Sequence, residues 1–471
     1  MIEIKTFMNA GALTEFLHSA AKFGNRGVNP TMSQMHCDQC EQTFRGIACE
    51  DMGVCGKNPD VESLQKILLY GLKGMASYKH HARRLGKVDE EVEAFIEEAL
   101  FATVTNVNFD IPSLLNMVLE CGRMNLKVMQ MLNDGHVEVM GKPSPVEITE
   151  GIQEGPGILI TGHDMVDLKR LLEQVEGTDI KVYTHGEMMP GHMYPELRKH
   201  KNLAGHYGDA WQKQRDEFER FGGPIIGTTN CVLIPWDTST YSDRFYTTRA
   251  TAVPGIKVLS GEDFSEVIAR AKEIGNLKVT DLKKSTVGFH YSVLLDAADH
   301  SVKAVQTGEV KRFFVIGGCD GAAPGRNYFS DYAANTPADT LILTLGCGKY
   351  RIRQHDHGTI KLDGLEVPRL LDMGQCNDAY GAIQVALALA NAFKCGVNDL
   401  PLTLVISWFE QKAVAVLLTL LHLGVKGIRL GPTLPAFITP NVLAILQEQF
   451  DLQPIGTDGA ADVKAVMAGS I

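Results

Sequence analysis

The sequence predicts a multidomain α/β protein, in which an N-terminal helical domain precedes two doubly wound domains built on parallel sheets. The first observation behind this prediction is a helical pattern up to about residue 150, where apolar residues recur at positions i, i+3, i+4 and i+7. The second is a change of pattern after residue 156, where short β-rich apolar runs alternate with helical segments. Such alternation is typical of parallel α/β architecture.

The predicted helices of the first part fall in three segments, and proline and glycine mark the breaks between the parts. The helical segments are residues 61–86, 90–103 and 111–132. The stretch GKPSPVEITEGIQEGPG (141–157) then interrupts the helical pattern, and a softer break occurs at residues 275–290. We therefore expect domains at residues 1–150, 151–305 and 306–471.

Composition and charge narrow the kinds of binding partner and the cellular compartment that we expect for this protein. The 471 residues carry a net charge of −11, which argues against a nucleic acid or a membrane surface as a general partner. The first 16 residues include acids and have no apolar core of the kind that an export signal needs. The most apolar tract, residues 413–425, is too short to span a bilayer and predicts a buried helix. We expect a cytoplasmic protein, whose clustered cysteines serve as metal ligands or in redox chemistry and not as disulfides.

A residue that can bind a metal follows each strand-like run in the second part of the chain. Six runs are clearly strand-like, namely ILITG, VYTHG, IGTTN, FFVIGG, ILTLG and VISWF, whereas a seventh, LLDMGQ, is less so. Open α/β sheets build their sites outside the carboxyl ends of strands, so these side chains can converge although they lie far apart in the chain. Thiolates combined with imidazole and carboxylate form a metal-binding set. The residues are His163, Glu187, Cys231, Cys319, Cys347, Glu410 and Cys376.

Each of these residues also has a purely structural interpretation. A single Cys after a strand is more often a small buried residue, and a single His or Glu at a strand end commonly lies beside a helix start or in solvent. Repetition over six strands argues against coincidence, but the pattern alone leaves the metal and the structural interpretation equally open and does not show that the residues share one centre. Cys121 and Cys395 lie in helical contexts, where we expect burial.

Four cysteines lie close together near the start, in HCDQCEQTFRGIACEDMGVCG (36–56), at the spacing C-x2-C-x8-C-x5-C. A zinc site usually shows two Cys or His pairs separated by a longer loop. Here one C-x2-C pair is followed by irregular gaps, which is closer to the thiolate ligation of an iron–sulfur cluster. The spacing favours iron–sulfur and leaves zinc, or no metal, as alternatives.

Seven further motifs follow in order: GHD, YTHGEM, TTNC, GGCDGAAPGRNY, LGCGKYR, MGQCNDAY and SWFEQKA. Together with the four-cysteine stretch they resemble the hybrid-cluster protein family, also called prismane proteins, from that stretch to near the C-terminus. The resemblance implies a [4Fe–4S] cluster ligated by Cys37, Cys40, Cys49 and Cys55. It also implies a hybrid [4Fe–2O–2S] cluster between the two α/β domains, with the ligands His163, Glu187, Cys231, Cys319, Cys347, Cys376 and Glu410.

The resemblance further implies the activity of a hydroxylamine reductase, which uses two electrons and two protons to form ammonia and water. A small nitrogen oxide would be the substrate, and a redox protein the electron donor. The implied catalytic residues are Glu410 as a ligand, Cys319 at the position of a family persulfide, and Lys412 as a neighbour of the cluster. Lys412 and a second candidate, His185 in THGE, could supply protons or stabilise charge, although a structural hydrogen bond is the alternative for His185.

Rival functions are open on the sequence alone. They are the reduction of nitric oxide to nitrous oxide, the transfer of NO to partner thiols with Cys319 as the relay, carbon monoxide dehydrogenase chemistry, and a redox-silent α/β protein. Two departures from the family pattern matter: about 36 residues precede the cysteine motif, and the helical part before Gly157 is short by roughly one helical bundle, as in the family's truncated class. Because fewer helices would uncover apolar surface, we expect a homodimer.

Overall fold

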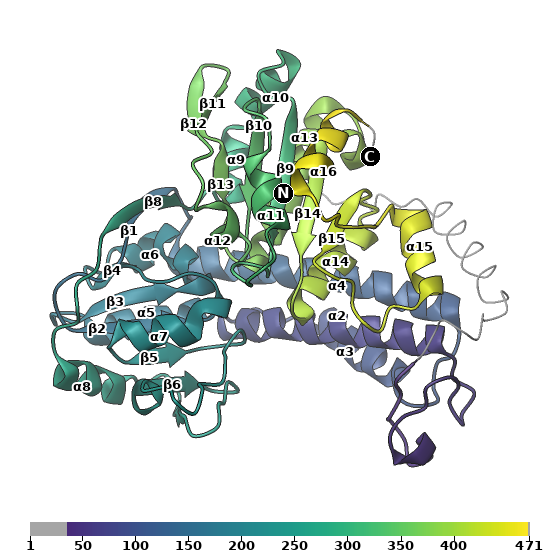
Figure 1. Ribbon diagram of the computed structural model, residues 1–471, viewed down its shortest axis with the longest axis horizontal. Helices are drawn as coiled ribbons and strands as arrows, with labels where there is room; N and C mark the ends of the chain where they lie inside the picture. Colours follow the sequence, from purple (N-terminus) through teal and green to yellow (C-terminus); the bar gives the residue numbers. More distant parts are fainter. Residues whose placement is uncertain (1–34, 470–471) are drawn as a thin grey trace. The chain divides into compact units, whose positions relative to one another are not determined.

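The computed structural model describes residues 35–469, and the first 16 residues, in which we expect no export signal, lie outside this range. The described chain forms two compact units (Figure 1). The helical unit comprises the described residues up to Leu132 together with Gly396–Ile455, and the sheet unit comprises Asn133–Cys395 and the described residues from Gly456 onward. The predicted class, α/β with parallel sheets, is confirmed. The division into domains at residues 150 and 305 stays a prediction.

The helical unit contains long helices and three short parallel strands in the order β14-β15-β16. Its helices begin at caps that the sequence supplies: the side chain of Asn58 accepts a hydrogen bond at the start of the second helix, before Pro59, and Asp89 does the same for the third. The elements are η1 (Phe44–Gly46), α2 (Pro59–Arg84), α3 (Glu90–Ala102), the first part of α4 (Ile111–Met140), η6 (Val397–Asp399), β14 (Leu402–Ser407), α14 (Gln411–His422), β15 (Ile428–Gly431), α15 (Pro440–Phe450) and β16 (Gln453–Pro454).

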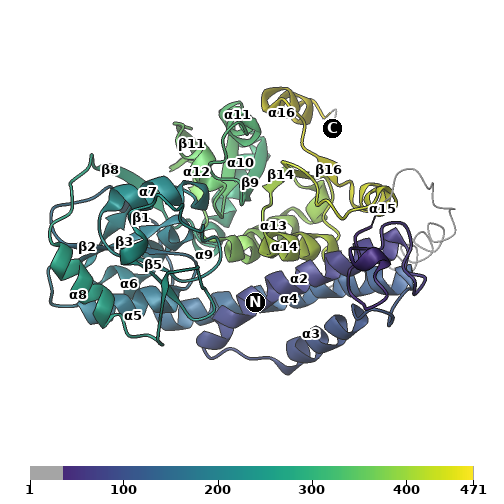
Figure 2. The ribbon, with the colours of Figure 1, turned by 60° about the horizontal axis from the view of Figure 1, so that its bottom comes forward.

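Glycines allow α14 to pack closely against α2 and α4. Figures 1 and 2 show α2 and α4 side by side, with α3 next to them. A Cβ on Gly74 of α2 would lie 2.2 Å from the carbonyl oxygen of Gln411, and one on Gly122 of α4 would lie 2.1 Å from that of Leu418. A side chain at either position would therefore push the backbone of α14 away. The three predicted helices and the buried helix near residues 413–425 are confirmed, and α4 continues to Met140.

The sheet unit contains an eight-stranded sheet in the order β7-β6-β5-β2-β3-β4-β1-β8. All neighbouring strands are parallel except β1 and β8, which are antiparallel. The strands are β1 (Val146–Glu150), β2 (Gly157–Thr161), β3 (Lys181–His185), β4 (Leu203–His206), β5 (Ile225–Gly227), β6 (Phe245–Thr248), β7 (Lys257–Leu259) and β8 (Lys283–Val287). The connecting helices are α5 (Met165–Val175), η2 (Gly186–Met193), α6 (Pro195–Arg198), η3 (Trp211–Lys213), α7 (Gln214–Phe221), η4 (Ser242–Arg244) and α8 (Ser265–Ile274).

A buried apolar cluster joins this sheet to its helices. Phe218 and Phe221 of α7 pack with Leu159, Tyr183 and Ile225 from the central strands. The central strand β2 is buried along its whole length, as expected of a parallel strand covered on both faces. Strand β8 lies inside the softer break that the sequence shows at residues 275–290, so this stretch completes the sheet by pairing with β1.

Three further parallel strands of the sheet unit run in the order β13-β10-β9. Helix α16 packs against α11, where the hydroxyl of Tyr328 donates to Asp462 over 2.6 Å. The elements are α9 (Tyr291–Asp296), α10 (Ala298–Gln306), β9 (Arg312–Gly318), α11 (Tyr328–Ala334), β10 (Thr340–Thr344), α12 (Lys349–Ile352), the hairpin β11 (Thr359–Leu362) and β12 (Leu365–Pro368), β13 (Leu370–Asp372), η5 (Cys376–Asp378), α13 (Ala379–Phe393) and α16 (Gly459–Met467). Among all the described helices, none has the length and apolar character needed to cross a membrane.

Candidate metal centres

Six of the seven predicted ligands of the second centre lie in the sheet unit, and each follows a strand. His163, Glu187 and Cys231 come after β2, β3 and β5, which are neighbours in the eight-stranded sheet. Cys319, Cys347 and Cys376 come after β9, β10 and β13, which are also neighbours. The strand-end pattern therefore places each set of three at one edge of its sheet.

Three of these residues form a set that could hold a metal ion. The donor atoms of His163, Glu187 and Cys376 all lie within 4.8 Å of one another, and His163 Nε2 lies 4.0 Å from Glu187 Oε2. The Thr229 hydroxyl lies 3.0 Å from His163 Nδ1 and also accepts the backbone N–H of His163. When Nδ1–H donates to Thr229, the lone pair of Nε2 faces the other two donors, which is the usual way in which a second residue orients a histidine ligand.

Two further predicted ligands, Cys231 and Cys347, lie beside this set. His163, Glu187, Cys231 and Cys347 line one small pocket. Burial, followed by the charges of Glu187, Cys231 and Cys319, raises the pKa of the Cys347 thiol. Thiols this close to one another and to a carboxylate are stable as thiolates only beside a strong positive charge, which a metal centre supplies. The residues present thus fit a centre with sulfur, nitrogen and oxygen ligands.

Backbone contacts between two glycine-rich loops bring Cys319 and Cys347 together. Gly318 N–H donates to the carbonyl of Leu345 over 3.1 Å, and Gly348 N–H donates to the carbonyl of Gly318 over 2.7 Å. Gly346 has φ +72°, and a Cβ there would lie 2.7 Å from the Gly318 oxygen. The motifs GGC and LGCG therefore need their glycines for close approach of two backbones.

Cys231 has an unusual backbone conformation, with φ +67°. Non-glycine residues in this region cost on the order of 1–3 kcal/mol and are concentrated at functional sites. The side chain of Gln214 holds the loop, since its Nε2 donates to the Cys231 carbonyl over 2.6 Å and its Oε1 accepts from Leu233 N over 3.0 Å.

Several polar side chains form hydrogen bonds to the backbone of the predicted ligands. The sequence pattern does not identify them, because it points only to the metal-binding residues that follow strands. Trp211 Nε1 and Gln212 Nε2 both donate to the carbonyl of Cys319 over 3.2 Å. Gln375 Nε2 donates to the carbonyls of His163 (3.2 Å) and Glu187 (2.7 Å). The one available signal was position: Gln375 directly precedes Cys376.

Glu410 and Lys412 lie in the helical unit, at the start of α14. The Glu410 carboxylate caps this helix by accepting the backbone N–H of Lys412 over 2.9 Å. The buried ammonium of Lys412 lies 3.6 Å from Glu410 Oε1 and 5.9 Å from the centre of the Tyr78 ring. Glu410 therefore has a structural role as a helix cap, and its role as a ligand stays a prediction.

The four cysteines of the opening motif also lie in the helical unit. Cys37 and Cys49 face each other in a short antiparallel bridge and are buried, Cys40 is half-buried, and Cys55 is exposed. The fully buried Lys57 places its ammonium 3.6 Å from Cys37 Sγ and 2.8 Å from Glu62. Burial raises the pKa of the Cys37 thiol and the charge of Lys57 only opposes that rise, so a stable thiolate here needs the further positive charge that an iron–sulfur cluster would supply. The motif therefore fits such a cluster.

The remaining candidates have structural surroundings. His185 Nδ1 lies 2.9 Å from the Thr161 hydroxyl, and its Nε2 lies 2.9 Å from Glu217 Oε2, so both ring nitrogens are engaged. Cys121 is buried as expected, and burial raises the pKa of its thiol to about 12, whereas Cys395 is only half-buried. None of the ten cysteines, all of which lie in the described range, forms a disulfide.

The model of the prismane/CO dehydrogenase family matches residues 35–116 and 110–462. The chain belongs to this family. A hydroxylamine reductase of Moorella thermoacetica is 54% identical over 433 residues, which cover 92% of this chain and 100% of the relative. One of Maridesulfovibrio salexigens is 51% identical and covers 87% of this chain and 76% of the relative. One of Geobacter metallireducens is 40% identical over an alignment of 552 residues, covering 92% and 99%.

Solved structures of this prismane/CO dehydrogenase fold include more distant proteins. Carbon monoxide dehydrogenase IV from Carboxydothermus hydrogenoformans superposes with a TM-score of 0.72 at 14% identity, covering 97% of this chain and 96% of the other. The nickel-free carbon monoxide dehydrogenase of Thermococcus sp. AM4 gives the same TM-score and identity, covering 96% and 92%. At this identity the likeness shows a shared fold.

Proposed function

We propose that this protein is a hydroxylamine reductase, which converts hydroxylamine, two electrons and two protons into ammonia and water. The observation that carries the proposal is the convergence of His163, Glu187 and Cys376 within 4.8 Å, next to further cysteines at strand ends. Relatives with 45–54% identity over most of the chain are named for this activity.

Two clusters are part of the proposal. The opening motif would hold a [4Fe–4S] cluster through Cys37, Cys40, Cys49 and Cys55. A hybrid [4Fe–2O–2S] cluster would be held by His163, Glu187, Cys231, Cys319, Cys347 and Cys376, with Glu410 as the seventh ligand that the family motif predicts. When bound, iron with mixed ligands supplies electrons and an open coordination position for a small N–O compound.

The protein's own residues would orient this centre and handle charge. Thr229 fixes the ring of His163, and Gln375 fixes the backbone of Glu187, through their hydrogen bonds. Lys412, whose side chain is buried, would donate a proton or stabilise negative charge on the substrate. Cys319 would carry the persulfide that the family motif predicts at this position. We also place the protein in the cytoplasm, where reducing conditions keep clustered thiols available as metal ligands.

Product analysis tests the proposed reaction. Anaerobically purified protein, with iron and sulfide determined, receives electrons from dithionite-reduced methyl viologen and is offered hydroxylamine or nitric oxide. We expect one ammonia for each hydroxylamine consumed, as the stoichiometry of the reaction requires. Faster formation of nitrous oxide from nitric oxide would favour the nitric oxide reductase instead. Transfer of NO to a peptide thiol without electron donor would favour an S-nitrosylase, and stoichiometric nickel would favour carbon monoxide dehydrogenase chemistry.

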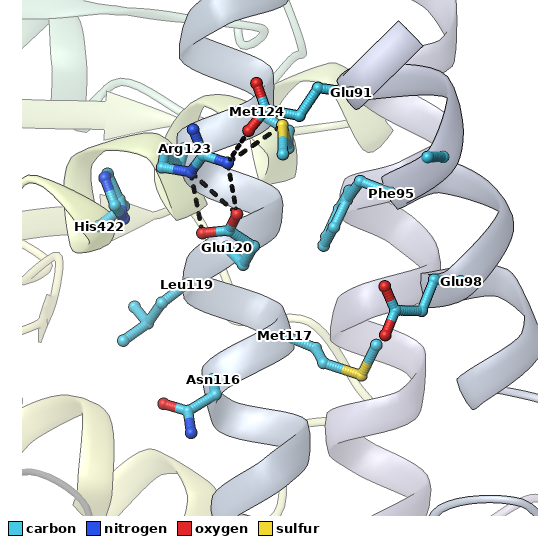
Figure 3. A pocket seen from close by; sticks show the side chains of 11 residues that line it. Glu91, Phe95, Glu98, Asn116, Met117, Leu119, Glu120, Arg123, Met124 and His422 are labelled. Atoms are coloured by element: carbon cyan, nitrogen blue, oxygen red, sulfur yellow. Dashed lines mark hydrogen bonds and ion pairs between the residues drawn. The ribbon is translucent and has the colours of Figure 1, made fainter.

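We further propose that the protein is a homodimer and that the α3 side of the helical unit forms the contact. A groove of about 680 Å³ lies there, and Figure 3 shows Phe95 and Glu98 of α3 and Met117 of α4 along it. Next to it, Leu100, Phe101, Val104 and Val107 are exposed, Phe101 by 63%. Exposed apolar side chains in this number mark an interaction surface.

Longer relatives carry residues that this chain lacks. The family model matches in two stretches that meet at residues 110–116, where α4 begins, and the Geobacter relative aligns over more positions than this chain supplies. Light scattering should give twice the monomer mass of 51.5 kDa. Phe101→Glu should produce monomers, whereas Val279→Glu, at a similarly exposed position of the sheet unit (52%), should not. A wild-type mass of 51.5 kDa at micromolar concentration would contradict the dimer.

A further inference from the structure

A buried chain of hydrogen bonds ends on the residue before Glu187. The hydroxyl of Tyr350 lies 2.8 Å from the carbonyl oxygen of Gly186 and 3.1 Å from His206 Nε2. The rings of Tyr350 and His206 stack with their centres 5.8 Å apart. Both side chains are fully buried. A donor and an acceptor in such a place are costly to leave without partners, so this pair is strongly constrained.

The series of hydrogen bonds continues from the other ring nitrogen of His206, Nδ1. The Thr184 hydroxyl lies 3.0 Å from His206 Nδ1 and 3.0 Å from His192 Nε2. Burial lowers the pKa of His192 to about 4 and that of His206 well below its ordinary value, so both imidazoles are neutral near pH 7. A neutral imidazole has one donor and one acceptor nitrogen.

Because each neutral imidazole has one donor and one acceptor nitrogen, the donor of each hydrogen bond in this series can be assigned. His206 Nε2 also faces the carbonyl of Gly208 at 3.0 Å, so this nitrogen carries the proton. His192 Nε2–H then donates to Thr184 and to the Gly205 carbonyl (3.2 Å), and Thr184 donates to His206 Nδ1. His206 Nε2–H is shared between the Gly208 carbonyl and Tyr350, and Tyr350 donates to Gly186. Successive hydrogen bonds in one direction polarise each other, and this series ends on the carbonyl of Gly186.

That carbonyl belongs to the peptide unit that leads into Glu187. Gly186 has φ +54°, a left-handed conformation suited to glycine, and it begins the 3-10 helix that carries Glu187. From the other side, Gln375 Nε2 donates to the Glu187 carbonyl (2.7 Å) and Cys376 N–H donates to Glu187 Oε2 (2.9 Å). Tyr350 itself lies three residues after Cys347, so it connects the loop of one predicted ligand to the backbone of another.

We propose that Tyr350 is a positioning residue, whose hydroxyl, held by His206, fixes the Gly186–Glu187 peptide and thereby directs the Glu187 carboxylate toward His163 and Cys376. The inference rests on the proposed function in that Glu187 serves there as a metal ligand. Tyr350 acts through Glu187 and does not itself need to contact the substrate.

Tyr350→Phe tests the inference, because it removes one hydroxyl and keeps the ring. Residues that orient metal ligands typically contribute about 10–100-fold to metal affinity or activity. We expect kcat for hydroxylamine to fall by about that factor with little change in KM, the electron paramagnetic resonance of the second centre to change, and a chelator to remove iron faster. The signal of the N-terminal cluster should stay the same. Tyr183→Phe is the matched control: Tyr183 is equally buried in the same unit and loses a 2.9 Å hydrogen bond with Gln153 N, yet all readouts should stay at wild-type values.

A second variant keeps the inference testable if Tyr350→Phe folds poorly. His206→Gln should give the same kind of changes, and in a Tyr350→Phe background it should add almost nothing, because His206 acts through Tyr350. The spectrum and the iron loss do not depend on the substrate, so they report on positioning even if hydroxylamine is not reduced. Unchanged iron retention and an unchanged spectrum in Tyr350→Phe would overturn the inference, as would full additivity of the two variants.

Discussion

Replacing Gly74 by Ala should destabilise the protein, although alanine is the better helix former. Alanine in place of glycine inside a helix stabilises it by about 1 kcal/mol. At Gly74, however, the new Cβ would lie 2.2 Å from the Gln411 carbonyl oxygen, 2.7 Å from its carbon and 2.8 Å from the Ala415 Cβ. A backbone oxygen cannot rotate away, so α14 must retreat by about 1 Å to reach ordinary contact near 3.4 Å. Overpacking typically costs about 1–3 kcal/mol of stability, and a substitution that forces a backbone to move should cost about the upper value or more. We expect a net loss of about 2 kcal/mol in the free energy of unfolding.

Gly71→Ala, in the same helix, is the matched control. Its new Cβ would meet the Leu418 Cδ1 at 2.6 Å and the Cys121 Sγ at 2.9 Å, which are atoms of buried side chains, so that a side-chain shift relieves the contact at lower cost than a shift of the α14 backbone. The same gain in helix propensity should then leave the stability close to that of the wild type. Anaerobic urea unfolding followed by circular dichroism measures both variants. Turnover should fall in Gly74→Ala as well, because Gln411 lies between Glu410 and Lys412. If Gly74→Ala were as stable as Gly71→Ala, the close packing of α14 on α2 would be refuted.

Four other variants probe the two centres and the pH response. Cys40→Ser should remove the N-terminal cluster and slow electron entry while the second centre assembles; equal loss of both paramagnetic signals would contradict two separate centres. Lys412→Ala should keep the iron content and lower turnover by about 10²–10⁴-fold, whereas Glu410→Gln should alter the cluster spectrum itself, and a native spectrum would show that Glu410 is not a ligand. Burial lowers the pKa of His290 to about 4, so the unfolded state binds the proton first as pH falls from 6.5 to 4, and stability is lost over that range. His290→Asn should reduce the stability that is lost between pH 7 and pH 4.5 by about 2 kcal/mol, as urea titrations at these two pH values would show.

The sequence was sufficient to locate the strands that the candidate ligands follow. Periodicity identifies a buried strand, and in a parallel sheet all strands end at one edge, so His163 and Glu187 could be expected to lie together on the sequence alone. Even the less strand-like run before Cys376 forms β13. Other strands are not evident from the sequence; β8 is one of them, because KKSTV is largely exposed and therefore lacks an apolar signal.

The residues that hold the candidate site in place could not be predicted in the same way. Trp211 and Gln375 act through hydrogen bonds to carbonyls of distant residues, and such bonds leave no periodic trace in the sequence. The left-handed conformation of Cys231 is equally invisible, because nothing in TTNC distinguishes it from an ordinary loop. Whether Glu410 completes the set of ligands stays a prediction of the family motif.

The backbone hydrogen bonds between the Gly318 and Gly346–Gly348 loops have a consequence for how the protein is matured. These bonds join peptide groups only, so folding alone brings Cys319 and Cys347 together. In this respect the site differs from a zinc finger, where metal binding supplies the free energy of folding. An apoprotein should therefore persist as a folded acceptor for iron and sulfide delivered later. A centre dismantled by an oxidant could then be rebuilt in the same molecule, without new synthesis of the chain.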